Sequence, residues 1–275
     1  MEPDNSNKGS TEQAGKPEKR NAFTELLAPK SKQPKPAAKA ASNRNEAKGR
    51  ATFGARDGLG TYIAKPESHR LYPLGPRVYH DEDFVAIHDM FPKSSVHLLL
   101  LPRDQSKTRL HPFDAFEDTE FLAKVKAETC KLRVLAAGEL RRKYGKDSVQ
   151  EQPRQAALSA DPPPNELPQG RDWGQEIVAG VHAVPSMNHL HVHVLSVDRY
   201  SERLKHRKHY NSFSTPFFVP IDDFPLAHDD ERRKPTEQGY LKRDFACWRC
   251  GEVFGNRFTD LKKHLEHEFM EWKKL

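Results

Sequence analysis

The pattern of apolar residues predicts a mixed helix and strand domain between residues 53 and 225. The stretch RVYHDEDFVAIHDMF contains two strand-like runs around the polar turn HDED, and VHLLLLP at residues 96–102 is typical of a buried central strand. Apolar positions at roughly helical spacing over residues 115–144 predict a long amphipathic helix. The runs EIVAGVHAVP and HLHVHVLSV then predict two more strands, joined by the tight connection PSMN. We therefore expect an α+β domain whose histidine-rich strand follows a turn.

Polar stretches divide the rest of the chain. Residues 1–52 are rich in Lys, Pro, Ala, Ser and Asn, which predicts a disordered basic arm because little apolar surface can be buried. Within it, NAFTELLAPK is either a transient helix or a segment that binds a repair-protein partner. Residues 147–173 contain Pro153 and the triplet PPP, so we expect a long flexible insertion there. Residues 226–275 are expected to form a linker, DDERRKPTEQG, and a small C-terminal domain.

Composition limits the classes of protein. Of 275 residues, 36% are hydrophobic and 31% charged, with a mean hydropathy of −0.85, too polar for one uniformly packed globule. No apolar run is long enough to cross a bilayer and the first residues do not resemble a signal peptide, so we expect an intracellular protein without a membrane partner. Cys130 lies in the predicted long helix and is expected to be a core residue, whereas Cys247 and Cys250 form a CWRC pair that suggests metal.

Three histidines alternate in the stretch MNHLHVHVLSVD, at positions 189, 191 and 193. Residues i, i+2 and i+4 of a strand face the same way, so the three imidazoles should line one face. They could be merely exposed, they could form a metal triad, or they could act on phosphorus, one imidazole attacking while its neighbours bind phosphate oxygens. His182, Ser186 and Lys93 supply further donors close by in the predicted fold, and no carboxylate adjoins the triad in sequence, which favours phosphorus chemistry.

The motif HLHVHVL at residues 189–195 resembles the signature of the histidine-triad (HIT) superfamily of nucleotide hydrolases and transferases. A closer resemblance is to its aprataxin branch, of fungal type. It rests on VAIHDMFPKSSVHLLLLP, on GVHAVPSMNHLHVHVLS, on LKHRKHYNSFSTPFF at residues 204–218, and on a terminal metal-binding motif. Together these cover most of residues 53–275. The resemblance implies a HIT fold, an antiparallel sheet with a long packed helix, followed by a small zinc finger. The basic arm and the 147–173 insertion depart from the pattern.

Site roles follow from the resemblance, position by position. His191 matches the nucleophile, which attacks an adenylate to give an AMP-histidine intermediate. His193, Ser186 and Lys93 match groups that hold the nonbridging oxygens, and His182 matches the partner of the leaving group. Nucleotide-binding positions are Asp89 at the ribose, Ile87 and Phe84 beside adenine, and His189 as an orienting residue; His97 is either structural or part of the site.

The C-terminal tail predicts a structural zinc site. Cys247 and Cys250 have the spacing of a zinc knuckle, and His264 lies 14 residues further on, on a predicted helix. The helical i+4 position brings Glu268 back to the same face, while His267 lies at i+3. Because the resembled fingers include a Cys-Cys-His-Glu version, we prefer Glu268 as the fourth ligand, with His267 as the alternative. We expect no metal requirement for hydrolysis itself.

Basic residues point to nucleic acid. Arg249, Arg257, Lys262 and Lys263 would give the finger a surface suited to phosphate contacts. A denser tract follows the histidine strand, and its predicted DNA-binding residues are Lys205, Arg207, Lys208 and His209. Phe53 is either a core residue or, as the resemblance implies, part of a wedge that stacks on a DNA end.

The resemblance implies a nuclear DNA-repair hydrolase that removes AMP from adenylated 5′ DNA ends, the products of abortive ligation at nicks. The same chemistry could remove a guanylate cap from a DNA 3′ end. Two alternatives remain. A general adenosine phosphoramidase or dinucleoside polyphosphate hydrolase would not need the finger, and a zinc-dependent adaptor that only binds nucleic acid would leave the histidines idle.

Overall fold

The computed structural model describes residues 55–67 and 78–275. Phe53 and the predicted basic arm lie outside the described residues. The larger part of the fold is built on a six-stranded antiparallel sheet with strand order β1-β2-β3-β5-β4-β6. Its strands are β1 (Tyr79–His80), β2 (Phe84–His88), β3 (His97–Pro102), β4 (Ile177–His182), β5 (Val192–Ser196) and β6 (Phe218–Pro220). This is the HIT-type sheet that the sequence predicted.

The pairing of the central strands brings the histidines together. His193 of β5 lies opposite Leu99 of β3 on one side and Gly180 of β4 on the other. Gly180 has no side chain because β6 passes close by: an added Cβ would lie 2.3 Å from the carbonyl oxygen of Val219. The register thus places His193 in the middle of the sheet, beside His182 at the end of β4.

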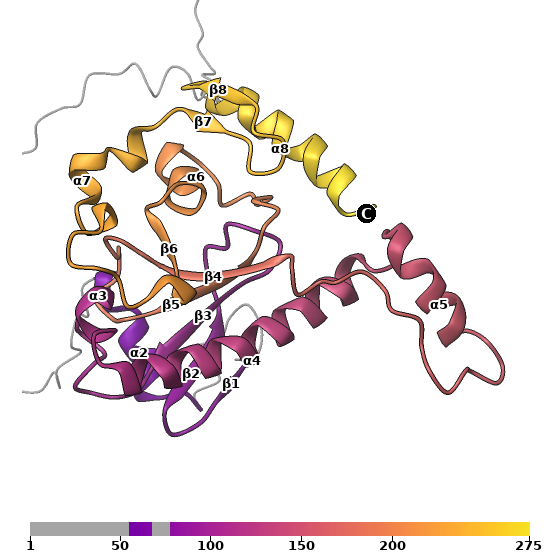
Figure 1. The fold of residues 1–275 in the computed structure, drawn as a ribbon, viewed down its shortest axis with the longest axis horizontal. Coiled ribbons are helices and arrows are strands. Elements are labelled where there is room, and N and C mark those ends of the chain that lie inside the picture. The colour runs from indigo at the N-terminus through magenta and orange to yellow at the C-terminus, as the bar shows by residue number, and fades with distance from the viewer. Residues whose placement is uncertain (1–54, 68–77) are drawn as a thin grey trace, which may run out of the picture. The chain divides into compact units, whose positions relative to one another are not determined.

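One face of the sheet is covered by α4 (Thr119–Tyr144), which follows the short α3 (Pro112–Ala115) and packs on β3, β4 and β5 (Figure 1). Asp118 caps α4 by accepting a hydrogen bond from the Phe121 amide at 3.0 Å. Alternate residues of the strands meet the helix in the main core, each worth about 1.5–3 kcal/mol when fully buried. They include Leu98, Leu100, Val192 and Val194 from the sheet and Leu122, Val125, Leu132 and Leu140 from α4.

One prediction about this side of the fold is wrong. Cys130 is exposed on α4, so it is not a core residue. The predicted flexible insertion 147–173 contains η3 (Val149–Glu151) and α5 (Gln152–Leu158), and both Glu151 and Trp173 are buried. Its flexibility stays a prediction.

The opposite face of the sheet carries the histidines and is covered by short helices. α2 (Leu59–Ala64) packs over β2 and β3 and contacts η1 (Ala55–Asp57), and α6 (Arg207–Ser214) lies near the other edge, against β6. The apolar residues under α2 form a separate small cluster of Leu59, Ile63, Val85, Ile87, Leu99 and Leu101.

The C-terminal part folds around a two-stranded sheet and a helix. It consists of β7 (Phe245–Ala246), β8 (Val253–Gly255) and α8 (Phe258–Trp272). The predicted linker is helical in part, and the elements that lead to β7 are η4 (Ile221–Asp223), η5 (Glu231–Arg233), α7 (Pro235–Gln238) and η6 (Tyr240–Lys242). Within the described ranges, none of the helices is both long and apolar enough to cross a membrane.

Candidate active site and metal centre

The alternating histidines lie on a bend and the start of a strand rather than along one strand. β5 begins at Val192, so His193 lies within it, His191 directly precedes it and His189 lies in the bend. The imidazoles of His191 and His193 meet, with ring centroids 4.8 Å apart. The ring of His189 lies against Gly60 of α2, where an added Cβ would approach Nε2 to 2.6 Å. His189 therefore lies on the histidine side of the sheet, beside α2, but the prediction that it belongs to the same strand as His193 is wrong.

His191 has the geometry of a neutral nucleophile. Its Nδ1 lies 2.7 Å from the carbonyl oxygen of His189, which can only accept, so Nδ1 carries the proton. The lone pair is therefore on Nε2. Burial lowers the pKa of His191, and the hydrogen bond to His189 and the charge of Asp89 oppose that shift. The ring is neutral near pH 7, the state that an attacking imidazole needs.

His97 fixes the tautomer of His193 through a short relay. The Lys93 amide donates to Nδ1 of His97 at 3.0 Å, so the proton of His97 is on Nε2. That nitrogen lies 2.9 Å from Nδ1 of His193, which must accept, and the proton of His193 is then on its own Nε2. Nε2 of His193 is buried and has no hydrogen-bond partner among the described residues. A phosphate oxygen would satisfy this donor.

His182 lies next to His193 in the same pocket. Its ring centroid lies 4.5 Å from that of His193, and its buried Nε2 also lacks a partner within the described part of the chain. Burial lowers the pKa of His97 to about 4 and that of His182 to about 3, and it holds the pKa of His193 well below its usual value. The pocket is thus a group of neutral imidazoles, in which Nε2–H of His193 is placed to donate a hydrogen bond to an anion.

Sequence reasoning missed the aromatic wall of this pocket. Phe213 of α6 contacts the rings of His97, His182 and His193 at centroid distances of 5.4, 4.5 and 5.0 Å. The buried Arg199, which has a φ of 48°, donates to the Phe213 carbonyl at 2.9 Å and so holds α6 in place. An apolar wall excludes water, which is the physical cause of the lowered histidine pKa values. The apolar pattern of α6 is too short to reveal this role.

Lys93 and Asp89 lie at the rim of the pocket. Lys93 is half-buried and its Nζ donates to the Phe91 carbonyl; burial lowers its pKa, while Asp89 opposes the shift. Asp89 accepts from the Phe91 amide at 2.7 Å, and its second oxygen lies 3.5 Å from Nε2 of His97. The two predicted residues are therefore brought to the histidines, with one cation and one anion on the same short turn.

The loop between β4 and β5 is tied to η1. Ser186 is exposed, and its carbonyl accepts from Nε of Arg56 at 3.0 Å. The side-chain amide of Asn188 donates to the Asp57 carboxylate at 2.9 Å, and the backbone amide of Asn188 donates to the Arg56 carbonyl. The predicted phosphate donor Ser186 thus lies on a loop whose position depends on the segment just before α2.

The two predicted base-flanking residues lie on opposite faces of the sheet. Ile87 is in the small cluster under α2, on the histidine side. Phe84 is in the main core with the α4 residues, and it also lines a pocket with Asp83, Asp104 and Asp118 on that side. The prediction that Phe84 flanks the base is therefore wrong, because residues three apart in a strand cannot face the same way.

The pocket also contains a group that could hold a metal ion: Asp89, His97 and His193, whose ligand atoms lie within 4.8 Å of one another. The nitrogens of the two histidines already hydrogen-bond to each other. A metal would have to break the relay in order to use both lone pairs.

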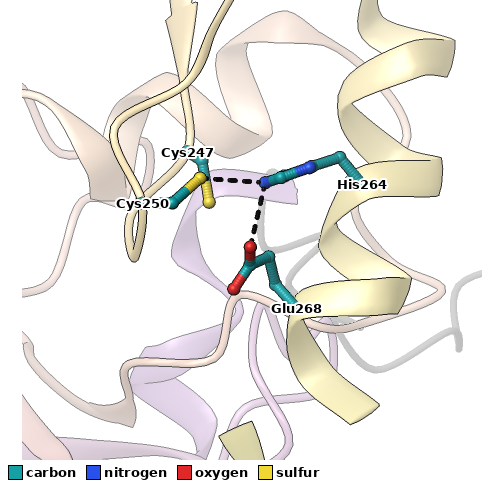
Figure 2. A group of neighbouring side chains, drawn as sticks. All are labelled: Cys247, Cys250, His264 and Glu268. Atoms are coloured by element: carbon teal, nitrogen blue, oxygen red, sulfur yellow. Dashed lines mark hydrogen bonds and ion pairs between the residues drawn. The ribbon is translucent and has the colours of Figure 1, made fainter. Parts of the chain in front are cut away.

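The C-terminal motif assembles a second, different cluster, shown in Figure 2. Cys247 and Cys250 lie on the connection between β7 and β8, and their thiols face His264 and Glu268 of α8. All four ligand atoms lie within 4.8 Å of one another, with Cys250 Sγ 3.2 Å and Glu268 Oε1 3.4 Å from His264 Nε2. His267 is exposed, so the structure favours Glu268 as the fourth ligand. Two thiolates, an imidazole and a carboxylate are a donor set that fits structural zinc.

Charged neighbours orient two of these ligands. Glu252 Oε2 lies 3.4 Å from Nδ1 of His264, the arrangement that turns the other ring nitrogen toward a metal. Arg249 pairs with the second oxygen of Glu268 at 2.7 Å, and this hydrogen bond holds the pKa of Glu268 below its usual value. Arg249 was expected on a phosphate-binding surface; its guanidinium instead supports a ligand.

The basic tract is partly used for structure. Arg207 donates to the carbonyls of Lys242 and Arg243 at 3.1 and 2.6 Å, which joins α6 to the chain that enters β7. Nδ1 of the half-buried His209 lies 3.0 Å from the Arg203 carbonyl. The side chains of this tract that are exposed and predicted to bind DNA are Lys205 and Lys208.

Comparison with protein families gives matches to both parts. Residues 75–200 match the HIT domain, and residues 214–271 match the family described as C2HE / C2H2 / C2HC zinc-binding finger.

Individual relatives match most of the chain. The aprataxin-like protein of Schizosaccharomyces pombe is 38% identical over 220 residues, which cover 79% of this chain and 82% of the relative. The aprataxin-like protein of Saccharomyces cerevisiae is also 38% identical, covering 78% of this chain and 95% of the relative. A crystal structure of the aprataxin ortholog Hnt3 in complex with DNA is similar with a TM-score of 0.60 and 33% identity, covering 79% of this chain and 96% of that one.

Proposed function

The chain belongs to the aprataxin family of HIT proteins with a C-terminal zinc finger, and from that premise we propose that it is a DNA-repair hydrolase that removes AMP from adenylated 5′ DNA ends. A nuclear location follows from this role. Repair of abortive ligation products at nicks would restore a ligatable 5′ phosphate and release AMP. The similar Hnt3 structure is a complex with DNA, which supports the substrate class.

The reaction proceeds in two transfers at one phosphorus. Nε2 of His191 attacks the adenylate phosphorus, an N–P bond forms, the anhydride P–O bond breaks, and the DNA 5′ phosphate leaves. His182, beside the pocket centre, is assigned to the leaving oxygen. Water then attacks the AMP-histidine: its oxygen bonds to phosphorus, one proton passes to solvent, the N–P bond breaks, and AMP and neutral His191 are released. Dividing hydrolysis in this way replaces one slow step with two faster ones.

The neighbouring groups stabilise charge on the phosphate during both steps. His193 presents its Nε2–H through the relay, Lys93 brings a positive charge, and Ser186 adds a hydroxyl from the loop. Asp89 is assigned to the ribose hydroxyls, Ile87 to the base, and His189 to orienting the nucleophile through its carbonyl. The single observation that carries the proposal is the 2.7 Å contact of His191 Nδ1 with the His189 carbonyl, which leaves Nε2 free beside the unpartnered Nε2 atoms of His182 and His193.

The finger supplies the preference for DNA. Zinc, held by Cys247, Cys250, His264 and Glu268, would fix α8 to the connection between β7 and β8. Hydrolysis itself would need no metal. The exposed Lys205 and Lys208 follow the histidine strand and would contact phosphates. Phe53 is assigned to stacking on the DNA end.

A direct test compares two substrates. The protein, with a His191→Ala variant beside it, is incubated with a 5′-adenylated nicked duplex and with adenosine phosphoramidate. We expect faster turnover of the DNA, and no turnover of either by the variant. Equal or faster use of the small molecule would instead favour a general phosphoramidase.

A second substrate is suggested by the Hnt3 structure described as a complex with DNA and guanosine. The same pocket would then also remove a guanylate cap from a DNA 3′ end. Release of GMP from a 3′-capped duplex, lost in His191→Ala, is the expected result, and absence of GMP release would restrict the activity to adenylate.

A further inference from the structure

The segment between α4 and β4 meets the far end of the finger helix. The amides of Val149 and Gln150 donate to the carbonyls of Lys274 and Leu275 at 2.8 and 3.0 Å. These bonds join η3 to the residues that follow α8. The segment departs from the HIT pattern in sequence, and no step of the proposed reaction uses it.

A buried arginine lies between two tryptophans at the same place. The guanidinium carbon of Arg171 lies 4.4 Å from the ring centroid of Trp173 and 4.9 Å from that of Trp272. Nη1 of Arg171 also donates to the Trp272 carbonyl at 2.8 Å. Arg171 is 3% exposed and both indoles are 1% exposed, so the stacking is desolvated, where cation–π contacts are strongest.

Two glutamates complete the arrangement. Glu176 accepts from Nη2 of Arg171 at 2.6 Å and, through its other oxygen, from Nε1 of Trp272 at 2.8 Å. Glu151 accepts from Nε1 of Trp173 at 2.7 Å and from Nε of Arg141 at 3.1 Å. Each carboxylate therefore binds one indole and one guanidinium, and both indole N–H groups are satisfied. A buried charge network is stable only when its members are paired in this way.

These contacts join the strand that leads into the histidine pocket to the helix that carries two of the zinc ligands. Glu176 directly precedes β4, which ends at His182 in the pocket. Trp272 ends α8, whose earlier turns carry the zinc ligands His264 and Glu268. Along α8, Phe269 stacks on Tyr200 with ring centroids 4.1 Å apart, so the helix is packed against the catalytic fold near its C-terminal end.

We propose that Glu151, Arg171, Trp173, Glu176 and Trp272 form an aromatic clamp that sets the position of the zinc finger relative to the histidine pocket. Arg171 is its central positioning residue. A duplex must meet both the finger and the pocket, whereas a mononucleotide needs only the pocket. The clamp thus raises the efficiency on polymeric substrates by ordering two binding surfaces in advance. This inference rests on the proposed function for its substrate.

The test uses the zinc-loaded full chain with Arg171→Ala and, as a matched control, Arg142→Ala, which removes an exposed arginine from the last turn of α4. For Arg171→Ala we expect kcat/KM on the adenylated nicked duplex to fall by about tenfold, mainly through KM. Turnover of adenosine phosphoramidate should change by less than about twofold. Hydrogen exchange of the α8 amides should accelerate, and Arg142→Ala should change none of these quantities.

Two further variants separate the clamp from a folding defect. Arg171→Lys keeps the charge but loses the planar stacking, and Glu176→Gln keeps the shape but loses the charge. Both should fall between the wild type and Arg171→Ala in DNA turnover and in exchange of α8. Equal losses on both substrates, or unchanged exchange of α8, would overturn the clamp. Inactivity of the wild type on adenylated DNA would overturn the proposed function instead, and the exchange of α8 would still show whether the clamp holds the helix.

Discussion

The histidine pocket and the finger use overlapping residue types in opposite ways. In the finger, two thiols, an imidazole and a carboxylate converge with His264 Nε2 and Cys250 Sγ 3.2 Å apart. In the pocket, the imidazoles of His97 and His193 form a relay from donor to acceptor. Among the described residues, the buried Nε2 atoms of His182 and His193 and Nδ1 of His189 have no hydrogen-bond partner. The carboxylate Asp89 stays 3.5 Å from the relay.

This contrast shows that the neighbours, and not the histidines themselves, decide the chemistry. Where lone pairs converge and Glu252 and Arg249 orient the ligands, the arrangement suits a cation. Where burial keeps the rings neutral and backbone groups fix the tautomers, the arrangement suits a phosphate and an attacking nitrogen. Changing one region at a time should show whether the other responds.

The largest effect should come from removing the nucleophile. His191→Ala should lower kcat on adenylated DNA and on adenosine phosphoramidate by at least about 10⁴-fold, because no other group can form the covalent intermediate. Zinc content should stay at that of the wild type, measured by metal analysis of the same preparation. Residual turnover within tenfold of the wild type would mean that another group attacks.

Breaking the finger should produce a smaller and more selective loss. Cys250→Ser should release zinc and lower kcat/KM on the nicked duplex by about 100-fold, since one of two binding surfaces is lost. Adenosine phosphoramidate turnover should change little, because the pocket histidines lie on the six-stranded sheet and its loops and not on the finger. A parallel loss on both substrates would show that the two regions are not independent.

Changing His97 in the relay should lower kcat, by an amount that depends on whether the new side chain can accept from Lys93 and donate to His193. His97→Phe removes both the acceptor for Lys93 and the donor to His193, and kcat should fall by about 10- to 100-fold. His97→Gln has an acceptor and a donor, so it should recover much of that loss. Equal rates for the two variants would contradict the tautomer assignment.

The smallest effect concerns stability against pH. Burial lowers the folded-state pKa of His97 to about 4 and of His182 to about 3, whereas the unfolded chain titrates near the ordinary value. Between the folded-state and unfolded-state pKa values, the unfolded chain binds more protons than the folded chain. The free energy of unfolding should therefore be highest above about pH 6.5 and should decrease as the pH falls toward 4. Denaturant unfolding of His97→Phe should show a shallower decrease, by about 1 kcal/mol per pH unit; an unchanged slope would contradict the assignment.

The sequence predicted the metal site better than the pocket, for a physical reason. The zinc ligands come from two local motifs. Helical spacing allows both His267 and Glu268 near His264, and the preference for Glu268 came from the resemblance to Cys-Cys-His-Glu fingers. The strands of the sheet and the long helix were also predicted from periodicity. Phe84 was misplaced although strand alternation could have shown that it and Ile87 face opposite ways.

The remaining features depend on contacts between distant segments. The start of β5 at Val192 is set by pairing with β3, and the relay from Lys93 to His193 spans two strands. Cys130 could not be placed because the apolar positions of α4 outnumber those its buried face accepts: Val134 and Leu135 are also exposed. The contact of Arg171 with Trp272 links residues 101 positions apart, beyond any local pattern.

The central claim is that His191 carries the AMP during the reaction. Wild-type protein mixed with 5′-adenylated nicked DNA and quenched rapidly at alkaline pH should yield, by peptide mass spectrometry, an adenylyl group on His191 that decays as AMP appears. The same label on another residue, or full turnover with no labelled peptide at any time, would contradict the account.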